Sequence, residues 1–324
     1  MSGFSKNVLR LDAAGEVERI VAGIRSAARL FKRRGAVVAM SGGIDSSVVG
    51  ALCVRALGAQ RVFGLSLPEQ ESSTETAGLS AAIIDHLGVE SACVNITPML
   101  DAFGCYRTRE DAVSEVVPEF KSGWKFKIVL PPVTESDAYR VYSVVAQSPE
   151  GETITRKLTL SAYLRILAAT NYKQRVRKTL EYFHADRLNY FVAGTPNLLE
   201  YDQGFFVKLG DGAADVKPIA HLYKTQVYQL ADYLGVPQEI RSRPPTTDTY
   251  SMPQSQEEFY FSLPYDKMDL SLYAYKQGIT AEDAAPVIGL QADQMQRVFA
   301  DIRAKQAVAE YLHSAPKTIA DLQA

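Results

Sequence analysis

The sequence predicts an α/β fold: a parallel sheet of about five strands with helices on both faces, a small antiparallel insertion, and a helical C-terminal region. Three observations predict it. Short apolar strands alternate with helices in the first part of the chain, a polar and proline-containing stretch then breaks this alternation, and the pattern beyond residue 222 is mainly helical. With 324 residues, of which 47% are hydrophobic, the chain can bury a sizeable core.

The first part of the chain supplies the alternating elements. Helical spacing of apolar residues predicts a helix over 15–33, and the apolar run "GAVVAM" that follows predicts a buried strand over 35–40. The same reasoning predicts helices over 46–59 and 75–88, and strands over 61–68 and 91–97. Strands separated by helices form a parallel sheet with right-handed crossovers, so we expect helices on both of its faces.

Residues 107–157 are polar and contain prolines, unlike the alternating elements before them. A turn at "SPEG" and three candidate strands predict a small antiparallel sheet there, with strands over 124–130, 139–147 and 151–160. The α/β pattern resumes with a long helix over 161–187 and a fourth strand over 189–195. We therefore predict three parts: a main domain formed by 1–106 and 158–270, an insertion over 107–157, and a helical extension over 271–324.

Composition and charge exclude several classes of protein. The formal net charge of −2 argues against a protein that binds nucleic acid or a membrane surface. The three cysteines, Cys53, Cys93 and Cys105, form no CxxC pair and predict neither a disulfide framework nor a zinc site. The N-terminus has no uninterrupted apolar leader, and no apolar run reaches membrane-spanning length. We expect a soluble, cytoplasmic protein.

The stretch "SGGIDSS", residues 41–47, follows the first predicted strand and predicts a phosphate-binding loop. Glycines tolerate positive φ and let a ligand approach the backbone, and successive N–H groups at a helix N-terminus bind anions. The spacing GxxxxGK[ST] is absent, which disfavours transfer of a γ-phosphate. Asp45 would repel a phosphate unless Mg²⁺ lies between them. The expected phosphate contacts are Ser41, Gly42, Gly43, Asp45, Ser46 and Ser47.

Longer motifs indicate which family the chain resembles. "SGGIDSS" is similar to the loop of the N-type ATP pyrophosphatases, and "GTPNLLEYDQGFFVKLGDGAADVKP" over 194–218 resembles the NAD synthase run GTxNxxE…GDG…D…P. "NYKQRVR" over 171–177 and the stretch 222–246 also match that family. The resemblance to ammonia-dependent NAD synthases covers residues 16–104 and 165–270. It implies a Rossmann-like parallel sheet of the HUP type, the architecture of adenine nucleotide α-hydrolase-like proteins.

The resemblance also implies a reaction and a set of roles. In this family a carboxylate attacks the α-phosphorus of ATP, pyrophosphate leaves, and ammonia displaces AMP to form an amide. The resemblance implies deamido-NAD as the default acid and a homodimer as the assembly. It assigns ATP contacts to Arg175, Thr195 and Lys224, and Mg²⁺ to Asp45 and Glu200. It places Lys208 on phosphate and Asp211 near the substrate amide, so the candidate catalytic residues are Asp45, Lys208 and Asp211.

Departures from the family pattern leave alternatives open. Val207 and Leu209 stand where the family usually has Thr and Tyr, and the loop over 245–265 lacks a usual Leu-Gly. These changes favour a second hypothesis, an amidating ligase acting on another carboxylic acid; a third is a non-catalytic nucleotide-binding protein. Ammonia is expected from solution or from a separate glutaminase subunit. The insertion could close over the active site, extend the dimer contact or dock a partner. Arg241 and Arg243 are expected to cap a helix end or pair locally, and substrate binding is their alternative role.

Overall fold

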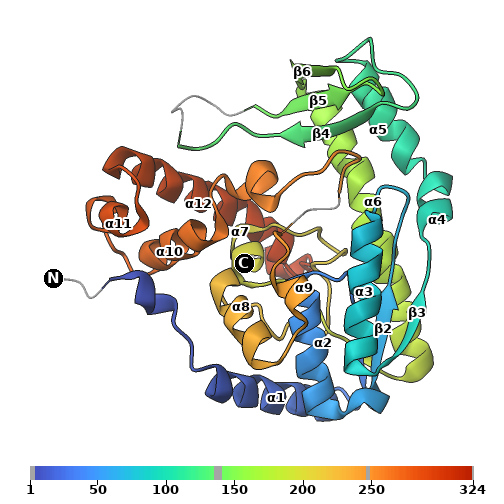
Figure 1. Ribbon diagram of the computed structural model, residues 1–324, viewed down its shortest axis with the longest axis vertical. Helices are drawn as coiled ribbons and strands as arrows, with labels where there is room; N and C mark the ends of the chain where they lie inside the picture. The colour runs from blue at the N-terminus through green and yellow to red at the C-terminus, as the bar shows by residue number, and fades with distance from the viewer. Residues whose placement is uncertain (1–3, 135–140, 246–248, 323–324) are drawn as a thin grey trace.

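The computed structural model describes residues 4–134, 141–245 and 249–322. Its centre is a parallel sheet with strand order β3-β2-β1-β7, of which β2 and β3 are labelled in Figure 1. The strands are β1 (Ala36–Ala39), β2 (Val62–Ser66), β3 (Glu90–Cys93) and β7 (Phe191–Val192). An isolated parallel bridge between Ala193 and Val216 extends the β7 edge. The predicted α/β fold is confirmed, and the sheet has four strands in the described part of the chain.

The sheet is covered by helices on both faces because the side chains of its central strand alternate. Val38 and Met40 point to a core shared with α1, α2, α3 and α8, whereas Val37 points to a second core under α4, α5 and α6. The helices of the first core are α1 (Ala13–Leu30), α2 (Ile44–Leu57), α3 (Thr74–Leu87) and α8 (Lys224–Tyr233). Those of the second are α4 (Thr97–Ala102), α5 (Cys105–Ser114) and α6 (Leu160–Leu188).

The predicted antiparallel sheet lies above the N-terminal end of α6 (Figure 1). It consists of β4 (Lys125–Val129), β5 (Ser143–Gln147) and β6 (Thr153–Lys157), in the order β4-β5-β6. The turn at "SPEG" is closed by a hydrogen bond from Gly151 N to Ser148 O of 3.0 Å. Residues 139 and 140 of the second predicted strand lie outside the described residues. Only strands and a turn were predicted within 107–157, whereas the structure also forms most of α5 there, and Ala112 and Val113 of α5 pack in one cluster with residues of β4, β5 and α6.

The C-terminal part is helical, as predicted. Its helices are α7 (Leu198–Gln203), α9 (Gln238–Arg241), the π-helical turn η3 (Glu257–Phe261), α10 (Tyr265–Lys276), α11 (Ala281–Ile288) and α12 (Ala292–His313). Short 3₁₀ turns are η1 (Lys6–Leu9), η2 (Ala59–Arg61) and η4 (Ala320–Leu322). Phe4 and Leu9 pack into the core of α10, α11 and α12, so the first residues are joined to the last helices. Among the described helices, none is long and apolar enough to cross a membrane.

Helix α8 begins over a buried carboxyl group. Asp269 of α10 is fully buried and accepts hydrogen bonds from the backbone N–H groups of Lys224 (3.1 Å) and Thr225 (2.6 Å). Burial raises the pKa of Asp269 from 3.8 to about 7. The folded protein therefore holds a proton that the unfolded chain releases over this interval, so ionisation of Asp269 opposes folding as the pH rises.

We expect the free energy of unfolding to fall between about pH 4 and about pH 7, and the fall to be smaller in the variant Asp269→Asn, because an amide cannot ionise. The comparison is of urea unfolding for the two proteins at a series of pH values. The control is Asp232→Asn, which alters an exposed carboxylate of α8. Equal pH slopes for wild type and Asp269→Asn would contradict the prediction.

Candidate active site

A cavity of about 430 Å³ lies at the carboxyl ends of the parallel strands. It is lined by the loops after β1, β2 and β7, by one side of α6, and by parts of the segment 240–260. The crossovers that follow β1 build the sheet towards β2 and β3, whereas β7 lies on the other side of β1. Ligands of open parallel sheets bind at such a reversal of strand order, which makes this cavity the candidate active site.

The predicted phosphate loop forms one wall of the cavity. Gly42 has φ +76°, and a Cβ at this position would lie 2.7 Å from Ser80 N and from Leu79 Cβ, so the loop requires glycine here. Gly43 lies at φ −80° and is the residue before α2. The helix begins at Ile44, two residues earlier than expected, which puts Asp45 in its first turn.

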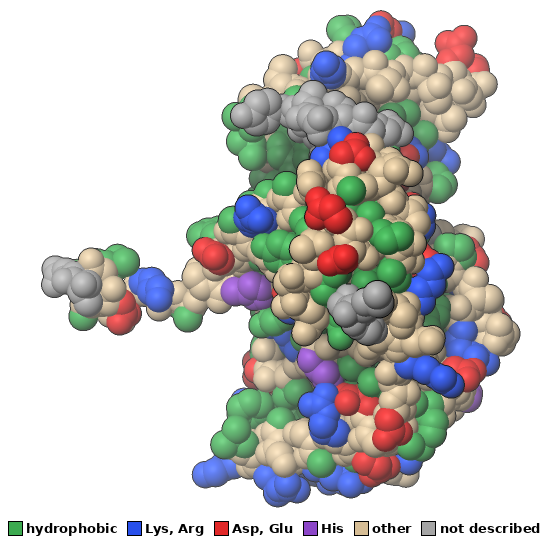
Figure 2. Space-filling model, turned by 90° about the vertical axis from the view of Figure 1, so that its left-hand side faces the viewer, with side chains coloured by type: hydrophobic (Ala, Val, Ile, Leu, Met, Phe, Trp, Pro, Cys, Tyr) green, Lys and Arg blue, Asp and Glu red, His purple; other side chains and the backbone are tan. Residues whose placement is uncertain are grey.

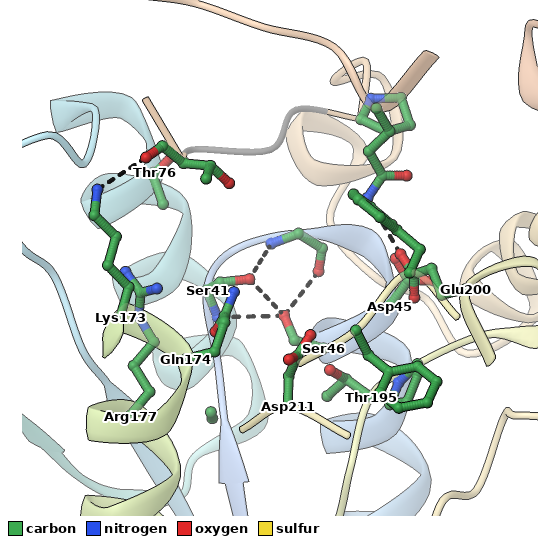
Figure 3. Close-up of a pocket in the computed structure, with 18 of the residues that line it drawn as sticks. Ser41, Asp45, Ser46, Thr76, Lys173, Gln174, Arg177, Thr195, Glu200 and Asp211 are labelled. Atoms are coloured by element: carbon green, nitrogen blue, oxygen red, sulfur yellow. Dashed lines mark hydrogen bonds between the residues drawn. The ribbon is translucent and has the colours of Figure 1, made fainter. Parts of the chain in front are cut away.

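Hydroxyl groups fix the shape of this loop. The Ser46 hydroxyl donates to Gly43 O (3.0 Å) and lies 3.3 Å from the Ser41 hydroxyl (Figure 3). The Ser47 hydroxyl donates to the same carbonyl at 2.8 Å. Ser47 is buried beneath the loop and does not line the cavity, whereas the other five predicted phosphate contacts do. Ser47 therefore stabilises the loop from below, and its side chain does not face the cavity.

Asp45 and Glu200 lie side by side at one edge of the loop (Figure 3). Asp45 is ion-paired with the buried ammonium group of Lys224 and accepts a hydrogen bond from Asn197 Nδ2 (3.1 Å). Glu200 closes a capping box with Asn197 at the start of α7 and accepts from Gln256 Nε2 (3.2 Å). Burial and the neighbouring Asp45 carboxylate raise the pKa of Glu200 to about 8. Burial opposes the charge on Lys224, but the Asp45 and Glu200 carboxylates outweigh it and raise the pKa of Lys224.

The opposite wall is α6, from which Lys173, Gln174 and Arg177 face the cavity (Figure 3). Lys173 is buried and donates to Glu69 Oε1 (2.8 Å), to Glu71 and to Thr249 O (2.9 Å). Lys173 and Arg177 were not among the predicted site residues, although Arg177 belongs to the matched stretch "NYKQRVR". Their spacing of four residues places them on one face of a helix, a signal that could have paired them.

The remaining predicted site residues divide into two groups. Thr195 and Asp211 line the cavity, and Asp211 Oδ1 accepts from Val207 N at 2.8 Å. Burial raises the pKa of Asp211. Lys208 and Arg175 do not line the cavity.

Lys208 is held by the end of α12. Its Nζ donates to Tyr311 O (2.8 Å) and Ser314 Oγ (2.9 Å) and lies 4.1 Å from the centroid of the Tyr311 ring. Arg175 Nε donates to the carbonyl of Lys208 at 3.4 Å. The structure therefore brings Asp45, Glu200, Lys224, Thr195 and Asp211 together and leaves Lys208 and Arg175 outside.

Of the two arginines after α8, Arg241 pairs locally, as expected, whereas Arg243 bonds to a residue of α3 that lies 167 positions away in the chain. Arg241 is ion-paired with Asp232 and donates to Val236 O (2.9 Å). Arg243 donates to Thr76 Oγ1 at 3.0 Å, near the start of α3, but it also lines the cavity. The segment that follows α9 is thus tied across the cavity to α3.

The segment 107–157, which was predicted to be an insertion and is called the insertion below, is hydrogen-bonded to the chain beside the cavity. Met252 N donates to Phe126 O (3.3 Å), and Phe126 N donates to Ser251 Oγ (2.9 Å), so the segment 251–254 runs along β4. The Arg109 guanidinium lies 5.0 Å from the centroid of the Phe126 ring and 5.2 Å from that of Tyr250. Figure 2 shows the insertion as an upper lobe separated from the body by a recess that contains hydrophobic side chains. Tyr142 of the insertion lines the cavity itself.

Comparisons with known proteins agree on one family. The family model for NAD synthase matches residues 16–121 and 141–308. The chain is 54% identical over 316 residues to the NH3-dependent NAD+ synthetase of Rhizobium meliloti (strain 1021), covering 98% of this chain and 95% of the relative. It is 56% identical over 310 residues to the enzyme of the same name from Mesorhizobium japonicum, covering 95% of this chain and 97% of the relative. The NH3-dependent NAD synthetase from Campylobacter jejuni has a similar fold, with a TM-score of 0.62 at 22% identity over 95% of this chain and 100% of that chain.

Proposed function

The chain belongs to the NAD synthase family, and from this membership we infer that it is a C–N bond-forming ligase that converts deamido-NAD, ATP and ammonia into NAD, AMP and pyrophosphate. Identity above 50% with NH3-dependent NAD+ synthetases over nearly the whole of both chains supports deamido-NAD as the acid. The observation that carries the chemistry is the group formed by the buried Lys224 and the partly buried Asp45 and Glu200, beside a phosphate loop that has no lysine of its own.

We propose that the loop holds the β- and γ-phosphates, which leave together as pyrophosphate. Ser41, Gly42, Gly43 and Ser46 line the cavity and would supply N–H and O–H donors, while Thr195 would contact ATP from the β7 side. Fixed donors and cations stabilise the negative charge that grows on departing phosphates. Lys224 is a buried cation that Asp45 holds beside this loop, and it would carry the charge that a loop lysine carries in other nucleotide-binding proteins.

The residues beside the loop fit a magnesium ion. Asp45 and Glu200 offer hard carboxylate oxygens, and the raised pKa of Glu200 reflects burial and a repulsion between carboxylates that a cation would relieve. Mg²⁺ is commonly bound by one or two carboxylates together with substrate phosphates. When bound, it would neutralise phosphate charge. Asn197 holds Asp45 and Gln256 holds Glu200, so both carboxylates are oriented by neighbouring amides.

The other predicted roles remain proposals. Asp211 lines the cavity and fixes the backbone at Val207, which supports a position near the reacting carboxyl and amide. The phosphate role of Lys208 requires its ammonium group to leave Tyr311 and Ser314. Arg175 would act through the same loop, since it bonds to Lys208 O. A homodimer, the cytoplasmic location, the source of ammonia and the domain boundaries stay predictions.

Incubation of the protein with ATP, MgCl₂, ammonium chloride and deamido-NAD is expected to yield NAD and AMP in equal amounts. The readout is NAD reduction by a coupled dehydrogenase, with AMP followed by chromatography. Omitting ammonium tests the amine, and replacing it by glutamine tests for a built-in glutaminase activity. Formation of AMP with another carboxylic acid and not with deamido-NAD would show that deamido-NAD is not the substrate. ATP binding without AMP formation for any acid would indicate a non-catalytic nucleotide-binding protein.

A further inference from the structure

The cavity has a polar end and an aromatic end. Glu181 and Tyr163, which are eighteen residues apart on α6, both line it, so it extends about 27 Å along the helix at about 1.5 Å per residue. The phosphate loop faces the part of α6 that carries Gln174 and Arg177 (Figure 3). At the other end the lining is aromatic and comes from the insertion, from α6 and from the segment before α10: Tyr142, Tyr163, Tyr250, Phe259 and Tyr260.

Two of these tyrosines form a stacked pair. The ring centroids of Tyr142 and Tyr163 are 4.5 Å apart, and their planes are inclined by only 12°. Both tyrosine side chains are half-buried. The neighbouring ring of Phe259 packs on Phe205 and Tyr250. Both tyrosines pack against the hydrophobic cluster that contains Phe126 and Tyr250. A parallel pair of this kind presents a flat face on which another planar ring can stack.

The insertion holds this pair in place. Tyr142 directly precedes β5, and its carbonyl accepts a hydrogen bond from Leu158 N at 2.9 Å. Strand β5 is bonded to β4, which in turn is bonded to the segment 251–254. The family model does not match residues 122–140, which include β4. The sheet that positions Tyr142 is therefore built partly from sequence outside the family pattern.

We propose that the Tyr142–Tyr163 pair is the stacking surface for a planar heteroaromatic ring of the acid substrate, and that the insertion contributes in this way to substrate binding. The proposal rests on the proposed function, in which the acid is deamido-NAD, a molecule with a pyridine ring at one end and an adenine at the other. ATP is anchored by its phosphates at the loop. Gln174, beside that loop, is eleven residues from Tyr163, about 16 Å along α6. We assign the ring at the aromatic end to the second substrate, and separate KM values for ATP and deamido-NAD test this assignment.

Steady-state kinetics of Tyr142→Ala test this inference. Loss of one stacking partner is expected to raise the KM for deamido-NAD about tenfold, because the substrate ring loses its stacking contact with an aromatic side chain. The kcat and the KM for ATP are expected to stay within about twofold of wild type. Tyr142→Phe keeps the ring and is expected to restore the KM for deamido-NAD. Tyr233→Ala removes an exposed tyrosine of α8 outside the cavity and serves as the matched control.

Inhibition by nicotinate mononucleotide identifies the ring. An inhibition constant that rises along with the KM for deamido-NAD assigns the pair to the pyridine, and an unchanged one assigns it to the adenine. An unchanged KM for deamido-NAD, or a raised KM for ATP alone, overturns the proposal. Calorimetric binding of deamido-NAD to wild type and Tyr142→Ala gives the same comparison without turnover, so failure of the proposed reaction is distinguished from failure of the stacking site. If Tyr142→Ala unfolds, Tyr163→Leu removes the other ring.

Discussion

Replacement of Asp45 by Asn is expected to lower the rate of pyrophosphate release about a thousandfold, with deamido-NAD, ATP, ammonium and Mg²⁺ all saturating. The substitution keeps the shape of the side chain and removes its charge. It takes away the carboxylate that holds the Lys224 ammonium beside the loop, and one of the two oxygen ligands proposed for Mg²⁺. Both losses act on the charge that develops on the departing phosphates.

The exposed pair of Asp232 and Arg241 supplies the control, because Asp232→Asn makes the same chemical change on the surface of α8. We expect that variant to turn over like wild type. Titration with Mg²⁺ separates the two losses: if Asp45 binds the ion, Asp45→Asn also needs a higher Mg²⁺ concentration for half-maximal rate. Wild-type turnover in Asp45→Asn would remove Asp45 from both proposed roles, provided that its unfolding midpoint shows a native fold.

The phosphate loop was predictable from sequence because its physical requirements are local. An apolar strand, a glycine that must adopt φ +76° and a helix N-terminus follow one another within a dozen residues. The capping box of Asn197 and Glu200 was not predicted, but it could have been, because Asn three residues before Glu is typical of a helix start. What the sequence could not supply was the hydrogen bond from Asn197 to Asp45, which joins residues far apart in the chain.

The position of the insertion was not predictable for the same reason. Its strands were predicted from the turn at "SPEG" and the segments beside it, but its attachment depends on contacts of Phe126 with Ser251 and of Arg109 with Tyr250, more than a hundred residues away. Helix α5 was missed because its exposed face is polar, with a polar run "RTRED" that resembles a loop. Lys208 was assigned from its place in a motif, and only the fold shows its ammonium group at the end of α12.

The buried ammonium of Lys173 joins the insertion side of the molecule to the active site. Lys173 pairs with Glu69 and Glu71 in the loop after β2, and Arg109 of α5 pairs with Glu71 at 2.7 Å. Tyr106 of α5 donates to Glu69 Oε2 at 2.8 Å. Burial lowers the pKa of Lys173, while its charge holds the pKa of Glu69 below the ordinary value in spite of burial. This cluster therefore fixes α5, α6 and the β2–α3 loop against one another.

Lys173→Met is expected to reduce the free energy of unfolding by about 3–5 kcal/mol, because it leaves the Glu69 carboxylate buried without its cation. Lys127→Met is the matched control, because Lys127 of β4 forms a more exposed ion pair with Glu258 of η3. Its loss is expected to reduce the free energy of unfolding by less than about 1 kcal/mol. The measurement is urea unfolding of the two variants and wild type at pH 7. A loss in Lys173→Met no larger than that in Lys127→Met would show that the buried cluster is not a stabilising connection.

A double variant separates the charge from the packing. In Lys173→Met with Glu69→Gln the uncompensated buried charge is gone, while the shape of both side chains is nearly kept. If the cost of Lys173→Met comes from the stranded carboxylate, adding Glu69→Gln recovers stability in that background but lowers it in wild type, where it breaks the pair with Lys173. Effects of Glu69→Gln that are equal in the two backgrounds would assign the loss to packing of Lys173 instead.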